Sequence, residues 1–167
     1  MTIFMKMDGL ASPLFNFEID CFLSKYKLPE YLGVFSSNNI PETPNNFILI
    51  CNLSNKEEKG SHFITICKIN SELFILDSLA LNIGNANLSE FISNLEYDKI
   101  NTIKDPIQSF QSISCGLFCV YFVLLFHVKS KQKLKIPLYK FVKNNLILND
   151  GICIDNINLL TKYIQLQ

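Results

Sequence analysis

The chain has 167 residues, 49% of them hydrophobic, so it is long enough to fold around one sizeable core. Its 15 lysines balance its 15 acidic residues and arginine is absent, which excludes a globally basic protein that binds nucleic acid over its whole surface. Six cysteines without the spacing of a disulfide framework, and no signal-peptide pattern, favour a reducing compartment and a protein that is not secreted. No repeat or change of composition divides the chain. We therefore expect one domain over residues 1–167, and nothing in the sequence requires more than a monomer.

The first predicted element is an amphipathic helix over residues 14–26, where apolar residues recur at helical spacing. Turn-forming residues then fill residues 36–46, which we expect to form a loop. The apolar positions of the helix are Phe15, Ile19, Phe22 and Leu23.

Three strand-like runs follow, at residues 46–54, 61–69 and 71–79. Each is rich in β-branched and aromatic residues, and polar stretches separate them. The last two are joined by Asn70 and Ser71, so they are predicted to form a hairpin.

The second half of the chain is predicted to be mainly helical, with helices at residues 87–95, 115–128, 138–146 and 156–164 and one strand at 99–105. The helix over 115–128 is apolar on nearly all sides, which indicates a buried core helix. Its apolar run of about 12 residues is shorter than the roughly 20 needed to cross a bilayer. These elements together predict an α+β fold with a small mixed sheet and helices packed against it.

Cys115 is the only cysteine at the predicted start of a helix, and Gly116 follows it, where a glycine lets another backbone or a substrate approach closely. Thiols attack peptide carbonyls as thiolates, and a helix N-terminus or a nearby imidazole favours that form. We therefore predict that Cys115 is the nucleophile of a thiol protease. The other five cysteines are expected to be core residues.

The sequence offers two histidines as the base. His127 lies on the same predicted helix as Cys115 but about 18 Å along its axis, which is beyond hydrogen-bond reach. His62 begins one predicted strand and Asp77 ends the next, so a hairpin would bring their side chains together. His62 is therefore the predicted base, and Asp77 is predicted to orient it.

An amide side chain that precedes the nucleophile is a common donor to the oxyanion in thiol proteases. Gln108 and Gln111 both precede Cys115, and we favour Gln108 because the nearer glutamine is held too close to the nucleophile. Cys115, Cys119 and His62 could also be ligands of one metal ion, but no fourth ligand is evident, so no metal site is expected.

The order His62, Asp77, Gln108, Cys115 and the blocks GSHF, LDSL and QSFQSISCGLFC resemble the adenovirus endopeptidase family. The resemblance covers roughly residues 46–126 and is closer to the adenovirus-type branch than to the related SUMO-specific proteases. It implies a papain-related fold with permuted chain order, these four residues in the catalytic roles given above, and cleavage of viral capsid or core precursors during virion maturation. Proteases of this type are also encoded by virophages and Maverick/Polinton elements. The implied location is the virion and the virus factory of the host cell.

Two features bear on activation and partners. The adenovirus enzyme is activated by a peptide that is disulfide-bonded to a cysteine before the glutamine-containing segment, whereas residues 81–114 here contain no cysteine. No cofactor is therefore required by the sequence, and activation by DNA or by a peptide stays open. Weak contact with DNA is the minor alternative to a solvated face for one cluster of lysines. This cluster comprises Lys129, Lys131, Lys133, Lys135, Lys140 and Lys143.

Two other functions remain open from the sequence. A protease that removes SUMO or other ubiquitin-like modifiers would use the same order of histidine, aspartate, glutamine and cysteine. A catalytically inactive binding module with the same fold is the alternative that is not an enzyme.

Overall fold

The computed structural model of the protein describes residues 14–57, 62–81, 84–132 and 150–166. Its strands form one five-stranded sheet in the order β1-β2-β3-β4-β5. The central strands β2, β3 and β4 are antiparallel neighbours, whereas β1 runs parallel to β2 and β5 runs parallel to β4. The four predicted strands are found as β2, β3, β4 and β5, and the predicted hairpin of β3 with β4 is confirmed. The strands are β1 Tyr31–Ser36, β2 Phe47–Asn52, β3 Phe63–Ile69, β4 Glu72–Leu76 and β5 Lys99–Thr102.

The edge strand β1 is an element that the sequence did not predict. Its six residues are only partly buried apart from Gly33, so no apolar alternation marks it as a strand. Gly33 has a φ of 133°, and the pairing with β2 is irregular between Tyr31 and Gly33. A glycine with such a φ inside a strand indicates a bulge, which explains why the strand pattern is weak there.

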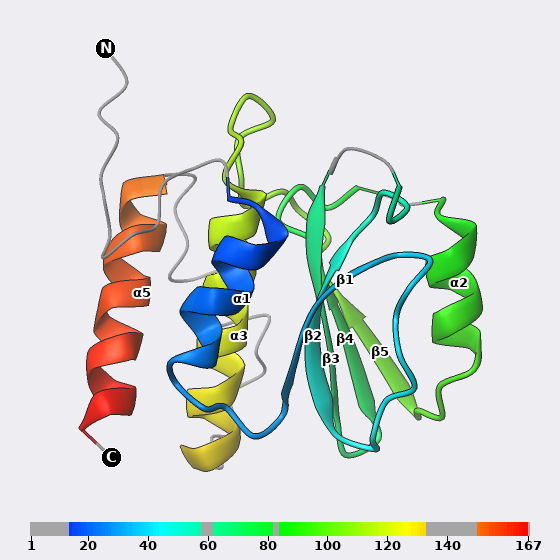
Figure 1. Ribbon diagram of the computed structural model, residues 1–167, viewed down its shortest axis with the longest axis horizontal. Helices are drawn as coiled ribbons and strands as arrows, with labels where there is room; N and C mark the ends of the chain where they lie inside the picture. The colour runs from blue at the N-terminus through cyan, green and yellow to red at the C-terminus, as the bar shows by residue number, and fades with distance from the viewer. Residues whose placement is uncertain (1–13, 58–61, 82–83, 133–149, 167) are drawn as a thin grey trace.

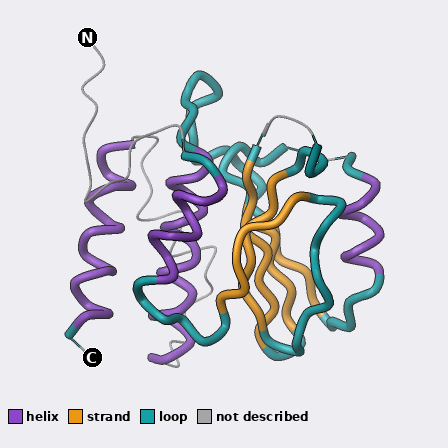
Figure 2. Tube along the Cα trace, in the orientation of Figure 1, coloured by secondary structure: helices purple, strands orange, loops and turns teal. Residues whose placement is uncertain are grey.

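Four described helices accompany the sheet, and they cover both of its faces (Figure 1). Helices α1, α3 and α5 lie on one side, with α3 next to the sheet and α5 outside it, while α2 lies alone on the other side (Figures 1 and 2). This arrangement confirms the predicted α+β class. The helices are α1 Asn16–Ser24, α2 Ala86–Ser93, α3 Cys115–Gln132 and α5 Asp150–Gln165.

The strand β2 is buried on both faces because each face packs against helices. Ile48 and Ile50 belong to the core beneath α1 and α3, whereas Phe47, Leu49 and Cys51 belong to the smaller core beneath α2. Successive side chains of a strand point to opposite faces, so one continuous apolar run serves both cores. Burial of each such aliphatic or aromatic side chain contributes about 1.5–3 kcal/mol to folding.

The predicted core helix is confirmed, since every residue from 117 to 128 of α3 is buried. The predicted first helix is also confirmed, but Phe15 caps it and is 62% exposed instead of facing the core. The last predicted helix begins earlier than expected, at Asp150.

Within the described residues, no helix is both long and apolar enough to span a membrane. The predicted helix at 138–146 and the side chains of the lysine cluster lie outside the part that the structure describes.

Candidate active site

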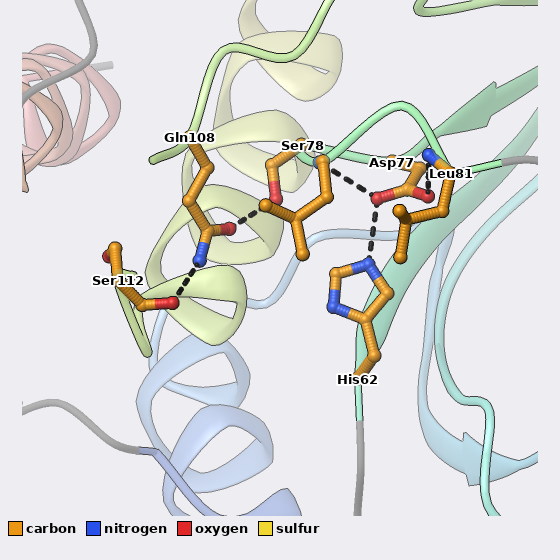
Figure 3. Close-up of polar contacts among 7 residues, drawn as sticks. His62, Asp77, Ser78, Leu81, Gln108 and Ser112 are labelled. Atoms are coloured by element: carbon orange, nitrogen blue, oxygen red, sulfur yellow. Dashed lines mark hydrogen bonds and ion pairs between the residues drawn. The ribbon is translucent and has the colours of Figure 1, made fainter. Parts of the chain in front are cut away.

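The β3–β4 hairpin brings His62 and Asp77 into direct contact. His62 immediately precedes β3 and Asp77 immediately follows β4, and the two antiparallel strands place these ends side by side. The His62 Nε2 atom lies 2.7 Å from Asp77 Oδ1, and both residues are buried (Figure 3). At this distance the carboxylate accepts the imidazole N–H and fixes which ring nitrogen carries the proton. The main-chain oxygen of His62 also accepts a hydrogen bond from the Leu53 N–H, which ties the start of β3 to the end of β2.

The turn after β4 holds the Asp77 carboxylate in place through main-chain donors. Asp77 Oδ1 accepts from the Leu79 N–H at 2.9 Å. Its Oδ2 accepts from the Leu81 N–H, also at 2.9 Å (Figure 3). The Asp77 main-chain oxygen accepts from the Ala80 N–H, and Ala80 has a φ of 50°. An alanine in this left-handed region is strained, so the turn is maintained by its hydrogen bonds. The aspartate is thereby oriented before any substrate binds.

Cys115 is the first residue of α3, where the helix dipole favours a negatively charged side chain. Ser114 precedes it, and its main-chain oxygen accepts the first helical hydrogen bond, from the Phe118 N–H. Cys115 and His62 line the same cleft, and the thiol is close enough to the imidazole to affect its pKa. Because Asp77 occupies Nε2, the nitrogen available to the thiol is Nδ1.

The pKa of His62 reflects these two contacts. Burial by itself lowers the pKa of this imidazole, but hydrogen bonds and charge interactions with Asp77 and Cys115 outweigh burial and raise the pKa to about 9. The imidazolium is therefore the stable form of His62 at neutral pH, as a cysteine–histidine ion pair requires.

Gln108 lies in the same site, although it comes from the irregular segment between β5 and α3. Its Nε2 donates to the Ser112 main-chain oxygen at 2.9 Å, and its Oε1 accepts from the Ser78 hydroxyl at 2.5 Å (Figure 3). Gln108 lines the cleft together with His62 and Cys115, whereas Gln111 is exposed and is not among the lining residues. The geometry thus favours Gln108 over Gln111 as the amide beside the nucleophile.

A cleft of about 1010 Å³ contains these side chains. One wall is the start of α1, at residues 14–17, and another is the segment at 108–113 that leads to α3. Side chains at the end of β2 and in the following loop complete the cleft, among them Asn52 and Lys56. The volume and the accessible thiol fit a site for a polypeptide segment.

Several features of the site could not be foreseen from the sequence. Ser78 and Ser112 hold Gln108, yet a serine in a turn or loop carries no distinctive sequence signal. Gly116 has a different role from the expected one, because a Cβ atom there would lie 3.1 Å from Leu14 Cβ and 3.2 Å from Ile19 Cδ1. The element that approaches Gly116 closely is therefore α1. No group of three or more His, Cys, Asp or Glu side chains in the described segments is arranged to hold a metal ion.

Comparisons with known proteins point to viral proteases. No protein-family model matches the sequence. The chain is similar to a protease of ovine adenovirus D serotype 7 (isolate OAV287), with 30% identity over 105 residues, 54% of this chain and 52% of that protein. The chain thus spans about half the length of the curated relative it matches. Among solved structures, the ASFV pS273R protease matches with a TM-score of 0.50 and 14% identity, covering 86% of this chain and 66% of that one.

The two comparisons agree with the residues that carry the resemblance. The sequence similarity to an adenovirus protease confirms the predicted resemblance, and the structural match confirms the α+β fold expected from it. The chain therefore has the fold of a viral protease and resembles the proteases of adenoviruses in sequence.

Proposed function

We propose that this chain is a cysteine endopeptidase in which Cys115 is the nucleophile, His62 the general base and acid, and Asp77 the residue that orients His62. The observation that carries the proposal is the hydrogen bond between His62 and Asp77 beside Cys115, which lines the same cleft as His62 at the start of α3. An open cleft gives a polypeptide access to Cys115. A thiol that is paired with an imidazole and oriented by a carboxylate is the arrangement used for acyl transfer.

In the first half of the reaction, the Cys115 thiolate attacks the carbonyl carbon of the scissile peptide bond, and a C–S bond forms. The carbonyl electrons move to the oxygen, which becomes an oxyanion. When the tetrahedral intermediate collapses, the C–N bond breaks and the His62 imidazolium donates its proton to the leaving amine. The product is a thioester on Cys115.

The oxyanion needs hydrogen-bond donors at the start of α3. The Cys115 main-chain N–H is one, because N–H groups in the first turn of a helix have no partner within the helix. The Gln108 amide is the other: its bond to Ser112 uses one N–H, and an amide nitrogen carries two.

In the second half of the reaction, His62 takes a proton from water, the hydroxide attacks the thioester, and the Cys115 thiolate leaves.

The substrate that we propose is a viral capsid or core precursor, processed in the virion or the virus factory. Four large apolar side chains line the cleft and are more than half exposed, so they can contact an extended polypeptide. The similarity to adenovirus proteases supports a viral precursor over a cellular protein. The four side chains are Phe15, Phe17, Phe110 and Ile113.

The test uses the purified chain and a vinyl-sulfone peptide probe that ends in glycine, followed by mass mapping of the labelled residue. Labelling confined to Cys115 and lost in His62→Ala is the expected result. The expectation that Cys21 is a core residue was wrong, because it is exposed. It lies outside the cleft, so Cys21→Ala is the matched control and should leave labelling unchanged. The experiment is repeated with DNA added and with a synthetic precursor peptide added, which tests whether either one activates the enzyme.

Cleavage assays then separate the substrates. Processing of a capsid precursor without turnover of a Gly-Gly-linked modifier fusion supports the maturation protease. Rapid turnover of the fusion alone would favour a modifier-specific protease. Absence of labelling under every condition would favour an inactive binding module.

A further inference from the structure

Ser78 contacts the oxyanion donor, although it is absent from the catalytic steps above. It follows Asp77 in the chain and is 1% exposed. Its hydroxyl donates to Gln108 Oε1 at 2.5 Å, while its main-chain oxygen accepts from the N–H groups of Ile107 and Gln108 at 2.8 and 3.0 Å. Both the main chain and the side chain of Gln108 are therefore anchored on one residue.

The two partners of the Gln108 amide define its orientation. The Ser112 main-chain oxygen can only accept, so it takes an N–H of the amide, and the opposite amide oxygen faces the Ser78 hydroxyl. Rotating the amide by half a turn would place its oxygen against the Ser112 oxygen, which is repulsive. The Ser112 oxygen thus selects which end of the amide is the donor, and the Ser78 hydroxyl holds the amide from its oxygen end, so that the Nε2 edge stays in the position an oxyanion donor needs.

The main chain and the side chain of Ser78 have separable tasks. The two bonds to its main-chain oxygen connect the turn after β4 to the segment before α3, and they do not depend on the hydroxyl. The hydroxyl contacts the Gln108 amide oxygen. Replacing the hydroxyl therefore removes one of the two bonds that hold the amide, while its bond to Ser112 and the connection between the two segments remain.

We propose that Ser78 is a positioning residue, which holds the Gln108 amide in its donor orientation. Together with Asp77 it makes the turn after β4 the common support of the site, because Asp77 orients His62 and the next residue orients Gln108 (Figure 3). This inference rests on the proposed function, since an orientation of Gln108 affects catalysis only if the chain cleaves peptides. A donor that is fixed before reaction stabilises the developing oxyanion more than a mobile one.

The first test compares wild type with Ser78→Ala and Ser78→Thr in peptide cleavage. Loss of one oxyanion donor typically costs about 10²–10³ in kcat, so a misoriented donor in Ser78→Ala should lower kcat by about tenfold at unchanged KM. Ser78→Thr keeps a hydroxyl and should recover most of the rate. A peptide aldehyde, whose hemithioacetal oxygen occupies the oxyanion position, should bind Ser78→Ala about tenfold more weakly.

Two measurements exclude a purely structural effect. Reaction of Cys115 with an aromatic disulfide needs the thiolate but no oxyanion donor, so its rate in Ser78→Ala should match wild type. In a Gln108→Ala background, Ser78→Ala should change kcat less than about twofold, because the amide that Ser78 positions is gone. Thr161→Val, which removes a buried hydroxyl from α5, is the stability control and should leave kcat unchanged.

The outcomes are distinct. Wild-type kcat in Ser78→Ala, or an equal loss with and without Gln108, would overturn the positioning role while leaving the protease proposal intact. A wild-type chain that neither cleaves peptides nor binds the aldehyde would overturn the proposed function itself. If Ser78→Ala does not fold, Ser78→Cys replaces it in the same cycle, since a thiol fills the site and is a weak donor.

Discussion

His62 and Asp77 stand at adjacent ends of a hairpin, whereas Gln108 and Cys115 come from an irregular segment and the first turn of a helix. The register of β3 and β4 brings the first pair together across 15 positions of sequence. Gln108 depends instead on a few contacts with Ser78 and with its own segment. The proposed base is thus held by regular secondary structure and the proposed oxyanion donor by individual side-chain and loop contacts. We call His62 and Asp77 the hairpin half of the site, and Gln108 with its segment before α3 the loop half. Single substitutions should damage these two halves in different ways.

The largest effect should come from Cys115→Ala, which removes the nucleophile from the helix start. We expect kcat/KM to fall by about 10⁵-fold or more, with His62→Ala almost as severe, because the attacking pair acts as a unit. Cys115 is only partly buried, so the melting temperature of the Cys115→Ala variant should stay close to that of wild type. Peptide hydrolysis and thermal unfolding measure the two quantities. Substantial cleavage by Cys115→Ala would contradict the mechanism.

Asp77→Asn tests the hairpin half. The change should lower kcat by about 10³-fold, because the amide neither accepts the imidazole proton in the same way nor stabilises its charge. It should also reduce the free energy of unfolding by about 1–3 kcal/mol, because an amide nitrogen would face one of the N–H donors of Leu79 and Leu81. Kinetics together with urea unfolding check both results. A loss of activity without loss of stability would show that the turn is held by its main chain alone.

Gln108→Ala and Gln111→Ala form a matched pair for the loop half. Gln108→Ala should lower kcat by about 10²-fold, as expected for loss of one oxyanion donor. Gln111→Ala should stay within about twofold of wild type, because Gln111 is exposed and lies outside the cleft. Comparison of kcat for the two variants decides which glutamine is the oxyanion donor. A larger loss in Gln111→Ala than in Gln108→Ala would assign the donor to Gln111.

The same contrast explains what the sequence could predict. His62 and Asp77 were predictable because two strand-like runs around a short turn fix which strand ends meet. The choice between Gln108 and Gln111 was only a preference, because the segment that contains them has no periodicity. Its path depends on bonds to Ser78, which is 30 positions away from Gln108 and reaches it only in the folded chain.

The pH dependence should report the coupling within the hairpin half. Because His62 has a pKa raised from 6.5 to about 9, its contribution to stability is fully present below pH about 6.5 and is lost as the pH rises through about 9. The rate should fall about tenfold per pH unit above that value, since the ion pair needs the imidazolium. NMR titration of His62 and kcat/KM profiles measure this. In Asp77→Asn the midpoint should move to lower pH, and an unshifted midpoint would contradict the assigned cause.

The smallest effect should come from Gly116→Ala, which tests how the nucleophile's helix meets α1. Alanine favours a helix by up to about 1 kcal/mol over glycine, so helix propensity alone would predict stabilisation. Its Cβ would instead meet Leu14 Cβ at 3.1 Å and Ile19 Cδ1 at 3.2 Å, and both neighbours are buried. Overpacking of this kind costs about 1–3 kcal/mol, so we expect a net loss of about 1 kcal/mol in urea unfolding. Since Leu14 also lines the cleft, KM should rise while the reactivity of Cys115 persists. Ile19→Val removes the Cδ1 atom, so the double variant with Ile19→Val should lose less stability than the sum of the two single variants, which separates crowding by α1 from a direct effect on the site.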